Sequence, residues 1–180
     1  MSKKVFLKGT LILACTGLVS RIAGFFYRIF LSHAIGAEGL GLYQLILPLQ
    51  GLMAALSYTG IQSALSRLIA SRLALQEKKE AYFSLISGIF AAVFFSAVTG
   101  FLLFRHADFF ASTILKAPGT SDLLRLTAAS IPLCAIHSCI DSYYYARKKA
   151  SVPAAVQLSE QAVRIGATYI PVSYTHLTLP

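Results

Sequence analysis

The fold is decided by residues 7–32, which read LKGTLILACTGLVSRIAGFFYRIFLS. Apolar residues continue through this stretch for longer than the ~20 residues that a helix needs to cross the hydrocarbon core of a bilayer. Lys8 interrupts the start of the apolar run, and the run continues well past Cys15, so it does not have the short apolar core of a cleaved signal peptide. The stretch therefore predicts a transmembrane helix that remains in the protein.

The composition of the 180-residue chain also indicates a membrane protein. Hydrophobic residues make up 56% and charged residues 13%, whereas soluble domains carry about 25% charged residues. Too few polar side chains remain to cover a globule in water. On a soluble protein the net charge of +9 would suggest nucleic acid, but beside these apolar runs it favours anionic lipid at a membrane surface. We therefore expect membrane lipids, and no nucleic acid, among its partners.

Five apolar segments predict an all-α fold, a polytopic bundle of transmembrane helices. Pro48, Gly51 and Gly60 are expected to bend the second span. Residues 109–115 are too few to cross the membrane and predict an amphipathic turn at its surface. Residues 171–180 read PVSYTHLTLP, and we interpret them as foreign sequence or a disordered tail. The predicted spans, which form a partial N-terminal lobe over residues 1–170, are 7–32, 40–70, 82–104, 123–145 and 152–170.

Basic residues alternate in density between successive connections and thereby predict the orientation. Ten of them fall on one side of the predicted spans, namely Lys3, Lys4, Lys8, Arg67, Arg72, Lys78, Lys79, Arg147, Lys148 and Lys149. Three fall on the other side, namely Arg105, Lys116 and Arg125. Because Lys and Arg concentrate in cytoplasmic loops, we expect a multi-pass protein with its N-terminus in the cytoplasm.

Two arginines lie inside the first predicted span, where a charge is costly and usually faces protein or a wet cavity. Arg21 and Arg28 are seven residues apart, so nearly two helical turns place them on almost the same face, with Gly24 between them. Two fixed positive charges beside a residue without a side chain can hold an anion such as a pyrophosphate. The alternative is that Arg28 reaches the outer interface and Arg21 pairs with a carboxylate on another helix.

Two further pairs of polar residues lie four apart inside later spans. His137 and Asp141 either take up a proton or cation that drives transport, or form a structural pair near the end of the fourth span. Glu160 and Arg164 either form a local salt bridge, or leave Arg164 to face the cavity as a third positive group. The sequence leaves both alternatives open.

No motif of a known catalytic site occurs in the sequence. It lacks a Gly-rich phosphate loop followed by Lys-Ser/Thr, an HExxH motif, a G-x-S-x-G elbow and a carboxylate cluster for Mg²⁺. The cysteines, Cys15, Cys134 and Cys139, lack the spacing of metal ligands. We therefore expect no enzyme activity, no cofactor and no bound metal, and transport that is passive or coupled to H⁺ or Na⁺.

Two stretches carry a resemblance to a known family. Residues 6–49 read FLKGTLILACTGLVSRIAGFFYRIFLSHAIGAEGLGLYQLILPL. Residues 152–165 read VPAAVQLSEQAVRI and carry a Pro-x-Ala…Gln-x-x-Glu-Gln-x-x-Arg pattern. Both resemble the stage V sporulation protein B-like family of polysaccharide-biosynthesis flippases, a branch of the MATE-like superfamily. The resemblance covers the chain from residue 6 to about residue 170.

The resemblance implies a MATE-like bundle of twelve to fourteen helices in two lobes, of which this chain is a fragment of the N-terminal lobe. Such lobes rock by alternating access and move undecaprenyl-linked peptidoglycan or polysaccharide precursors outward across the bacterial cell membrane, in cell-wall synthesis and sporulation. The expected partners are a lipid-linked oligosaccharide or lipid II-like substrate and enzymes of cell-wall synthesis.

The related lipid II flippase implies a phosphate site in the first helix. Its Ser-Arg-x-x-Gly-Phe motif matches Ser20, Arg21, Gly24 and Phe25. Its next arginine corresponds to Tyr27 instead of Arg28, and a basic residue of its second helix corresponds to Leu52. The substrate-binding residues expected here are Arg21, Gly24, Arg28 and Arg164, with His137 and Asp141 as ion-coupling candidates.

Two other functions fit the same segments. One is a cation-coupled multidrug exporter of the same fold, in which His137 and Asp141 would form the ion site. Arginines in the first span argue against a cationic substrate for such a protein. The other is a non-transporting membrane scaffold for cell-wall synthesis.

Overall fold

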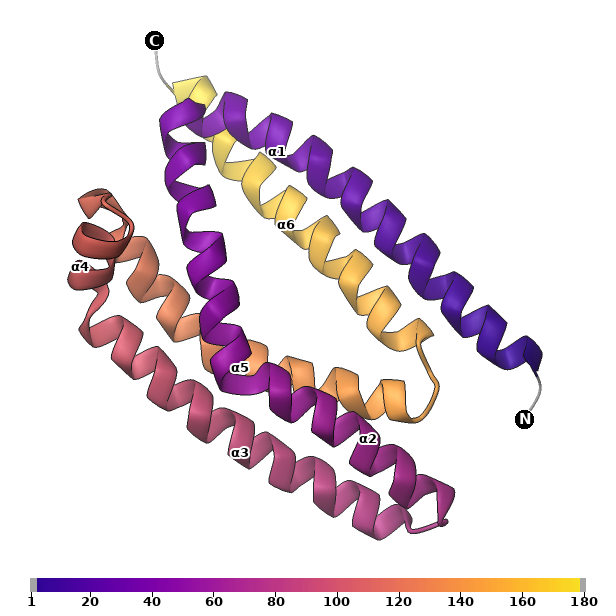
Figure 1. The fold of residues 1–180 in the computed structure, drawn as a ribbon. Coiled ribbons are helices and arrows are strands. Elements are labelled where there is room, and N and C mark those ends of the chain that lie inside the picture. Colours follow the sequence, from indigo (N-terminus) through magenta and orange to yellow (C-terminus); the bar gives the residue numbers. More distant parts are fainter. Residues whose placement is uncertain (1–2, 179–180) are drawn as a thin grey trace. The chain divides into compact units, whose positions relative to one another are not determined.

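A computed structural model describes the backbone of residues 3–178 and the side chains of residues 9–168. Within that range every regular element is a helix, which confirms the predicted all-α class (Figure 1). The helices, in chain order, are α1 (Lys3–Ala54), η1 (Ala55–Thr59), α2 (Gly60–Ala74), α3 (Lys78–Arg105), α4 (Ala107–Phe109), η2 (Phe110–Ile114), η3 (Pro118–Thr120), α5 (Ser121–Ala146) and α6 (Ser151–Thr178).

A single glycine separates the first two predicted spans. Gly36 has φ 75° and ψ 173°, and it interrupts the helical dihedral angles inside α1. Side chains rarely tolerate this backbone region, so a glycine is what allows the chain to turn here. Further along, Pro48 lies inside α1, and the π-helical turn η1 follows it before α2 begins. The second span is thus interrupted in the region where its proline and glycines predicted a bend.

Three described helices are long and apolar enough to cross a membrane, judged by length and composition. They are residues 9–74, 78–105 and 118–146. The first has 66 residues and would be about 99 Å long as one straight helix, far more than the ~30 Å of a bilayer core. The segments on either side of Gly36 are therefore each long enough for a crossing.

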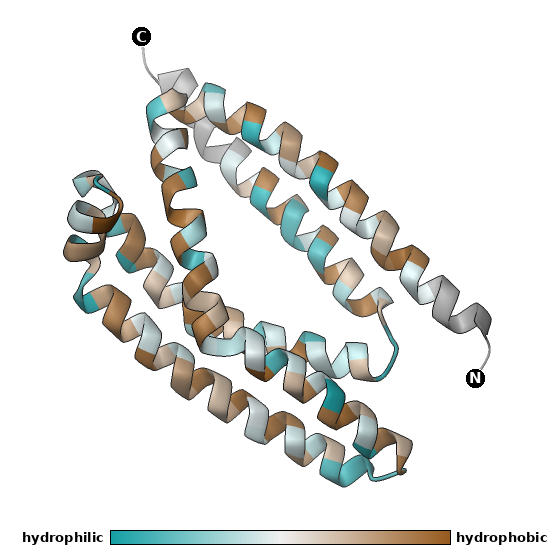
Figure 2. Cartoon of the chain, viewed as in Figure 1, coloured by the Kyte–Doolittle hydropathy of each residue, from teal (hydrophilic) through white to brown (hydrophobic). Residues whose placement is uncertain are grey.

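The last helix differs from these three. Over its described residues α6 does not reach the same apolar length, and polar positions recur along it, whereas α3 is apolar through most of its length (Figure 2). Its predicted crossing over residues 152–170 therefore stays a prediction. The backbone of α6 continues to Thr178, well into the segment that the sequence assigned to a tail. Residues 179 and 180 lie outside the described residues, and the foreign origin of residues 171–180 also stays a prediction.

The chain divides into two compact units, which we describe separately. Unit 1 comprises residues 1–40 and 148–180, and unit 2 comprises residues 41–147. In unit 2, α2, α3 and α5 pack on one another around two buried clusters. The first contains Ile46, Leu49, Met53, Leu103, Ala107, Ala111, Leu124, Ala128 and Ile131. The second contains Leu65, Ile69, Ala81, Ala92, Ala135, Cys139 and Ala146.

Small residues bring the helices of unit 2 close together. A Cβ atom added to Gly100 of α3 would lie 2.8 Å from the backbone oxygen of Ala128 in α5. Buried hydroxyls add hydrogen bonds across the same contacts: Ser57 lies 2.6 Å from Thr99, and Ser142 donates to the backbone oxygen of Gln62 at 3.1 Å. Close packing and interhelical hydrogen bonds are the forces that hold helices together in lipid.

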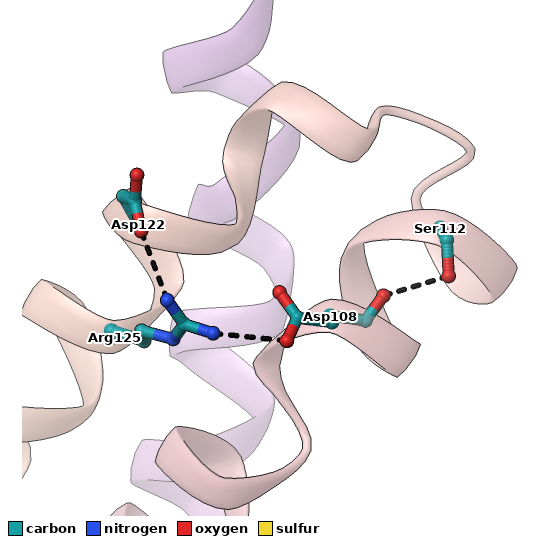
Figure 3. A network of polar contacts seen from close by, with 4 residues as sticks. All are labelled: Asp108, Ser112, Asp122 and Arg125. Carbon is teal, nitrogen blue, oxygen red and sulfur yellow. Dashed lines mark hydrogen bonds and ion pairs between the residues drawn. The ribbon is translucent and has the colours of Figure 1, made fainter.

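The short helical turn after α3 is fixed by an ion-pair network (Figure 3). Arg125 of α5 donates to Asp108 of α4 at 2.9 Å and to Asp122 at 3.2 Å. The Ser112 hydroxyl donates to the backbone oxygen of Asp108 at 2.7 Å. Phe109 and Ile114 of this turn remain exposed, as expected of a segment that lies at a membrane surface.

Candidate functional site

The candidate site lies in unit 1, along the contact between α1 and α6. A Cβ atom added to Gly9 would lie 4.0 Å from the Cβ of Ala150 at the start of α6. At the other end, the Tyr27 hydroxyl lies 3.3 Å from the Thr168 hydroxyl. Both contacts join residues that are 141 apart in the sequence. Between these contacts the two helices therefore run in the same direction, and a residue of α1 from Gly9 to Tyr27 lies at the level of the residue of α6 that is 141 positions later (Figure 1).

This register places two polar residues, each with a buried side-chain oxygen, at the same level of the contact. Ser20 is only 7% exposed, and the offset of 141 pairs it with Gln161. The Ser20 Oγ and the Gln161 Oε1 are both buried and have no hydrogen-bond partner among the described residues. Thr16, one turn before Ser20, is also 7% exposed. The α1–α6 contact is therefore a polar seam of Thr, Ser and Gln side chains, residue types that often hydrogen-bond between helices in a bilayer.

The predicted arginines lie along one edge of this seam. Successive residues of an α-helix turn by about 100°, so Arg21 and Arg28 lie about 100° and 80° forward from Ser20. On α6, Arg164 lies about 60° backward from Gln161 by the same geometry. Here forward means around the helix in the direction of increasing residue number. In two parallel helices that pack side by side, a residue displaced forward on one helix and a residue displaced backward on the other lie on the same side of their contact. The register also sets Arg164 beside Ala23, between the levels of Arg21 and Arg28.

Two glycines keep this edge open. Gly17 and Gly24 lie about 60° and 40° forward from Ser20, between the seam and the α1 arginines. A Cβ atom added to either glycine would meet no atom within 4 Å. The predicted site residue Gly24 therefore borders open space, and Gly17, which the sequence did not single out, borders it in the same way.

The three arginines have no counterion among the described residues. Arg21, Arg28 and Arg164 are exposed, and no described residue forms an ion pair or a side-chain hydrogen bond with them. Arg164 thus does not form the local salt bridge with Glu160 that the spacing allowed. Glu160 lies on the same edge, about 100° backward from Gln161, and its carboxylate partly offsets the positive charge there. Three guanidinium groups and one carboxylate leave the edge net positive.

The two ion-coupling candidates lie in unit 2. The Nδ1 of His137 is 3.9 Å from the Oδ2 of Asp141, both on α5, with side chains 43% and 20% exposed. They form a close pair, as their spacing predicted. At this separation the pair is an ion pair only when His137 is protonated.

Comparison with known proteins decides the family. The model of a family described as "Polysaccharide biosynthesis protein" matches residues 6–177. The chain belongs to this polysaccharide biosynthesis protein family. Stage V sporulation protein B of Bacillus subtilis (strain 168) is 32% identical over 165 residues, which make up 92% of the chain and 32% of that relative. The chain therefore spans about a third of the length of this relative. No solved structure matches the chain.

For this member of the polysaccharide biosynthesis family, the sequence identified the charged residues but not the seam beside them. Arg21, Arg28 and Arg164 were found because charges are rare inside apolar runs. Ser20 and Gln161 entered the sequence analysis only as members of the two resembling stretches, because neutral and common residue types draw no attention alone. A signal was present, because Gly9, Thr16, Ala23 and Ala150, Gln157, Arg164 repeat at intervals of seven, the period of parallel packed helices. The roles of all these residues remain predictions.

Proposed function

We propose that the full-length protein is a membrane flippase that moves undecaprenyl-linked peptidoglycan or polysaccharide precursors outward across the bacterial cell membrane. Membership of the polysaccharide biosynthesis family and the apolar helices of a multi-pass membrane protein support this proposal. The observation that carries it is the positive edge of the α1–α6 seam, where three arginines lie without a counterion among the described residues.

The edge is suited to a phosphate group for electrostatic reasons. A guanidinium is always charged and donates paired hydrogen bonds that match the oxygens of a phosphate. Arg21 and Arg28 are about 10.5 Å apart along the helix axis, and Arg164 lies between their levels on the facing helix. A pyrophosphate held here would exchange its water shell for fixed donors, which removes much of the cost of taking its charge into the membrane.

The rest of the proposal concerns the whole protein. Two lobes would rock around a central cavity, so that the arginines face the cytoplasm and then the outside in turn. The N-terminus would lie in the cytoplasm, and the protein would act without enzymatic catalysis and without a cofactor. Enzymes of cell-wall synthesis would supply its lipid-linked substrate and receive it after transport.

The His137–Asp141 pair supports a further element, coupling to an ion. We propose that H⁺ or Na⁺ binds at this pair during the transport cycle, because an imidazole and a carboxylate lie 3.9 Å apart inside an apolar helix. Replacement Asp141→Asn in the full-length protein should then abolish the dependence of transport on an ion gradient. Transport that keeps its gradient dependence in this variant would leave the pair a purely structural role.

A transport assay tests the proposed flippase. Full-length protein in liposomes would be given fluorescent undecaprenyl pyrophosphate carrying a sugar, and its appearance in the opposite leaflet would be measured. Loss of one charged hydrogen-bonding group at a binding site costs about 1.5–3 kcal/mol, so Arg21→Ala should weaken substrate binding roughly 10-fold to 150-fold. Arg21→Lys should retain part of the activity, since it keeps the charge but not the paired hydrogen bonds.

Arg67 provides a matched control for this experiment. It is also exposed and has no side-chain partner among the described residues, but it lies on α2 in unit 2. Arg67→Ala should therefore transport like the unchanged protein. Equal transport rates for Arg21→Ala and Arg67→Ala would remove the basis of the proposed flippase. If Arg21→Ala loses transport but still pulls down the same cell-wall synthesis enzymes, the scaffold alternative is excluded.

A further inference from the structure

The buried oxygens of Ser20 and Gln161 have no structural role in the state described. Each is shielded from solvent, and neither has a hydrogen-bond partner among the described residues. An unsatisfied buried polar group costs more stability than an ordinary hydrogen bond contributes, and it calls for an explanation such as a bound water or ligand. The register sets the two residues at the same level of the α1–α6 contact, so one bound molecule that reaches this level would satisfy both oxygens.

The open side of these groups is the arginine edge. Gly17 and Gly24 lie between Ser20 and the arginines, and the space around their missing side chains is empty. Gly17 and Gly24 would allow a small group to approach Ser20 from that side once α1 and α6 move apart slightly. Ser20 itself is 7% exposed, so this movement is needed before a ligand can reach it.

We propose that Ser20 and Gln161 form an uncharged subsite that binds a sugar hydroxyl or amide N–H of the same substrate whose phosphate the arginines hold. This proposal rests on the proposed function and specifies which part of the substrate is read. The Gln161 Oε1 only accepts hydrogen bonds, and the Ser20 hydroxyl can accept one as well as donate one, so a group that carries hydrogen-bond donors fits both. A sugar with hydroxyl and amide groups supplies such donors, whereas the lipid chain does not.

The distance between the uncharged subsite and the arginine edge agrees with the size of a phosphate-linked sugar. Ser20 is adjacent to Arg21 in the sequence, and Gln161 lies one turn before Arg164. The level of the Ser20–Gln161 pair is therefore about 4.5 Å along the axis from that of Arg164. A ligand that carries an anion and a hydrogen-bond donor a few ångströms apart would contact both parts at once. A free phosphate or a plain phospholipid headgroup would fill only the cationic part.

Two lipid probes separate the subsites in a binding experiment. Full-length protein in nanodiscs would be titrated with undecaprenyl pyrophosphate and with undecaprenyl pyrophosphate carrying N-acetylglucosamine. Loss of one neutral hydrogen bond corresponds to a fall in affinity of roughly 3-fold to 10-fold. Ser20→Ala and Gln161→Met should each weaken binding of the sugar-bearing probe by that factor and leave the sugar-free probe unchanged.

Control variants distinguish binding from folding. Ser159→Ala removes an exposed hydroxyl on the same helix that only donates to the Ala155 carbonyl at 2.9 Å, and it should leave both affinities unchanged. Gly17→Ala adds a methyl group where no atom lies within 4 Å, so it should fold normally and still impair the sugar-bearing probe selectively. Melting temperatures in detergent should not fall for Ser20→Ala, because the hydroxyl that it removes has no partner among the described residues.

The possible outcomes identify which proposal fails. Equal weakening of both probes by Ser20→Ala and Gln161→Met, or no weakening of either, would overturn the uncharged subsite. Arg21→Ala should weaken both probes, since both carry the pyrophosphate. If Arg21→Ala changes neither probe, the proposed flippase site fails, whatever the two neutral variants show.

Discussion

The Tyr27 hydroxyl donates to the Thr168 hydroxyl oxygen, 3.3 Å away, and so joins α1 to α6. The direction follows from the next bond, because Thr168 gives its single hydroxyl proton to the Arg164 carbonyl at 2.8 Å. The three groups form a short chain of hydrogen bonds that ends on the turn carrying the Arg164 side chain. Tyr27 is therefore joined to the turn of α6 that follows Arg164.

Disulfide formation tests the parallel register of the two helices. In a variant without the native cysteines, Gly9→Cys and Ala150→Cys together should form an intramolecular disulfide under mild oxidation. The 4.0 Å between the Cβ positions lies within the range that a disulfide spans. Mass spectrometry of the proteolysed protein would detect the linked peptides.

The control for this crosslink moves one cysteine by about two turns. Gly17→Cys with Ala150→Cys should not react, because eight residues along α1 correspond to about 12 Å. A crosslink in this pair and none in the first would show that the register is different from the one described.

Removal of the Tyr27 hydroxyl should weaken the α1–α6 contact. Tyr27→Phe keeps the ring and loses one neutral hydrogen bond, which corresponds to about 0.5–1.5 kcal/mol of unfolding free energy. Thermal unfolding in detergent would measure the change. Tyr43→Phe is the control on the same helix, since its hydroxyl has no hydrogen bond to a described residue, and an equal effect of both variants would contradict the assigned bond.

Substitution of Gly100 should separate α3 from α5. In Gly100→Ala the new methyl group would lie 2.8 Å from the Ala128 backbone oxygen, and a carbonyl held in a helix cannot move aside easily. We expect a loss of about 1–3 kcal/mol in unfolding free energy, as for other overpacked sites. Gly51→Ala is the opposite case, because no atom lies within 4 Å and alanine favours the helix by about 0.5–1 kcal/mol. Similar losses in both variants would argue against the close α3–α5 approach.

The ion pairs around Arg125 should contribute little to global stability. The side chains of Asp108 and Asp122 are 73% and 91% exposed, and exposed pairs typically contribute about 0–1 kcal/mol. Arg125→Gln should leave the melting temperature nearly unchanged but speed hydrogen exchange in residues 107–114. The effect should shrink at high salt, which screens these charges, and a large loss of stability would contradict this assignment.

The sequence predicts the helices well, because apolar runs of about 20 residues have few alternatives to a membrane helix. The ends of α3 and α5 agree with the predicted spans to within a few residues. The break between the first two spans also falls inside the predicted connection, at Gly36. The extent of α6 is different, because its polar residues make the end of the predicted span hard to place.

Packing between distant helices is not evident from the sequence. The charged residues Arg21 and Arg28 are recognisable because their cost in lipid is high, but which helix lies beside them depends on contacts 141 residues away. The close approach of Gly100 to Ala128 and the shared level of Ser20 and Gln161 likewise depend on register. A single sequence specifies residue types along a helix, while register emerges only when the neighbouring helix is placed.

The separation of 141 residues between the facing positions of α1 and α6 also has a consequence for biosynthesis. At a translation rate of about 5–20 residues per second, the ribosome needs roughly 7–28 s to make the chain between them. During that interval the buried hydroxyls of Thr16 and Ser20 are already made, while the helix that packs beside them is not. For those seconds the polar face of the first helix exists without its contact with α6.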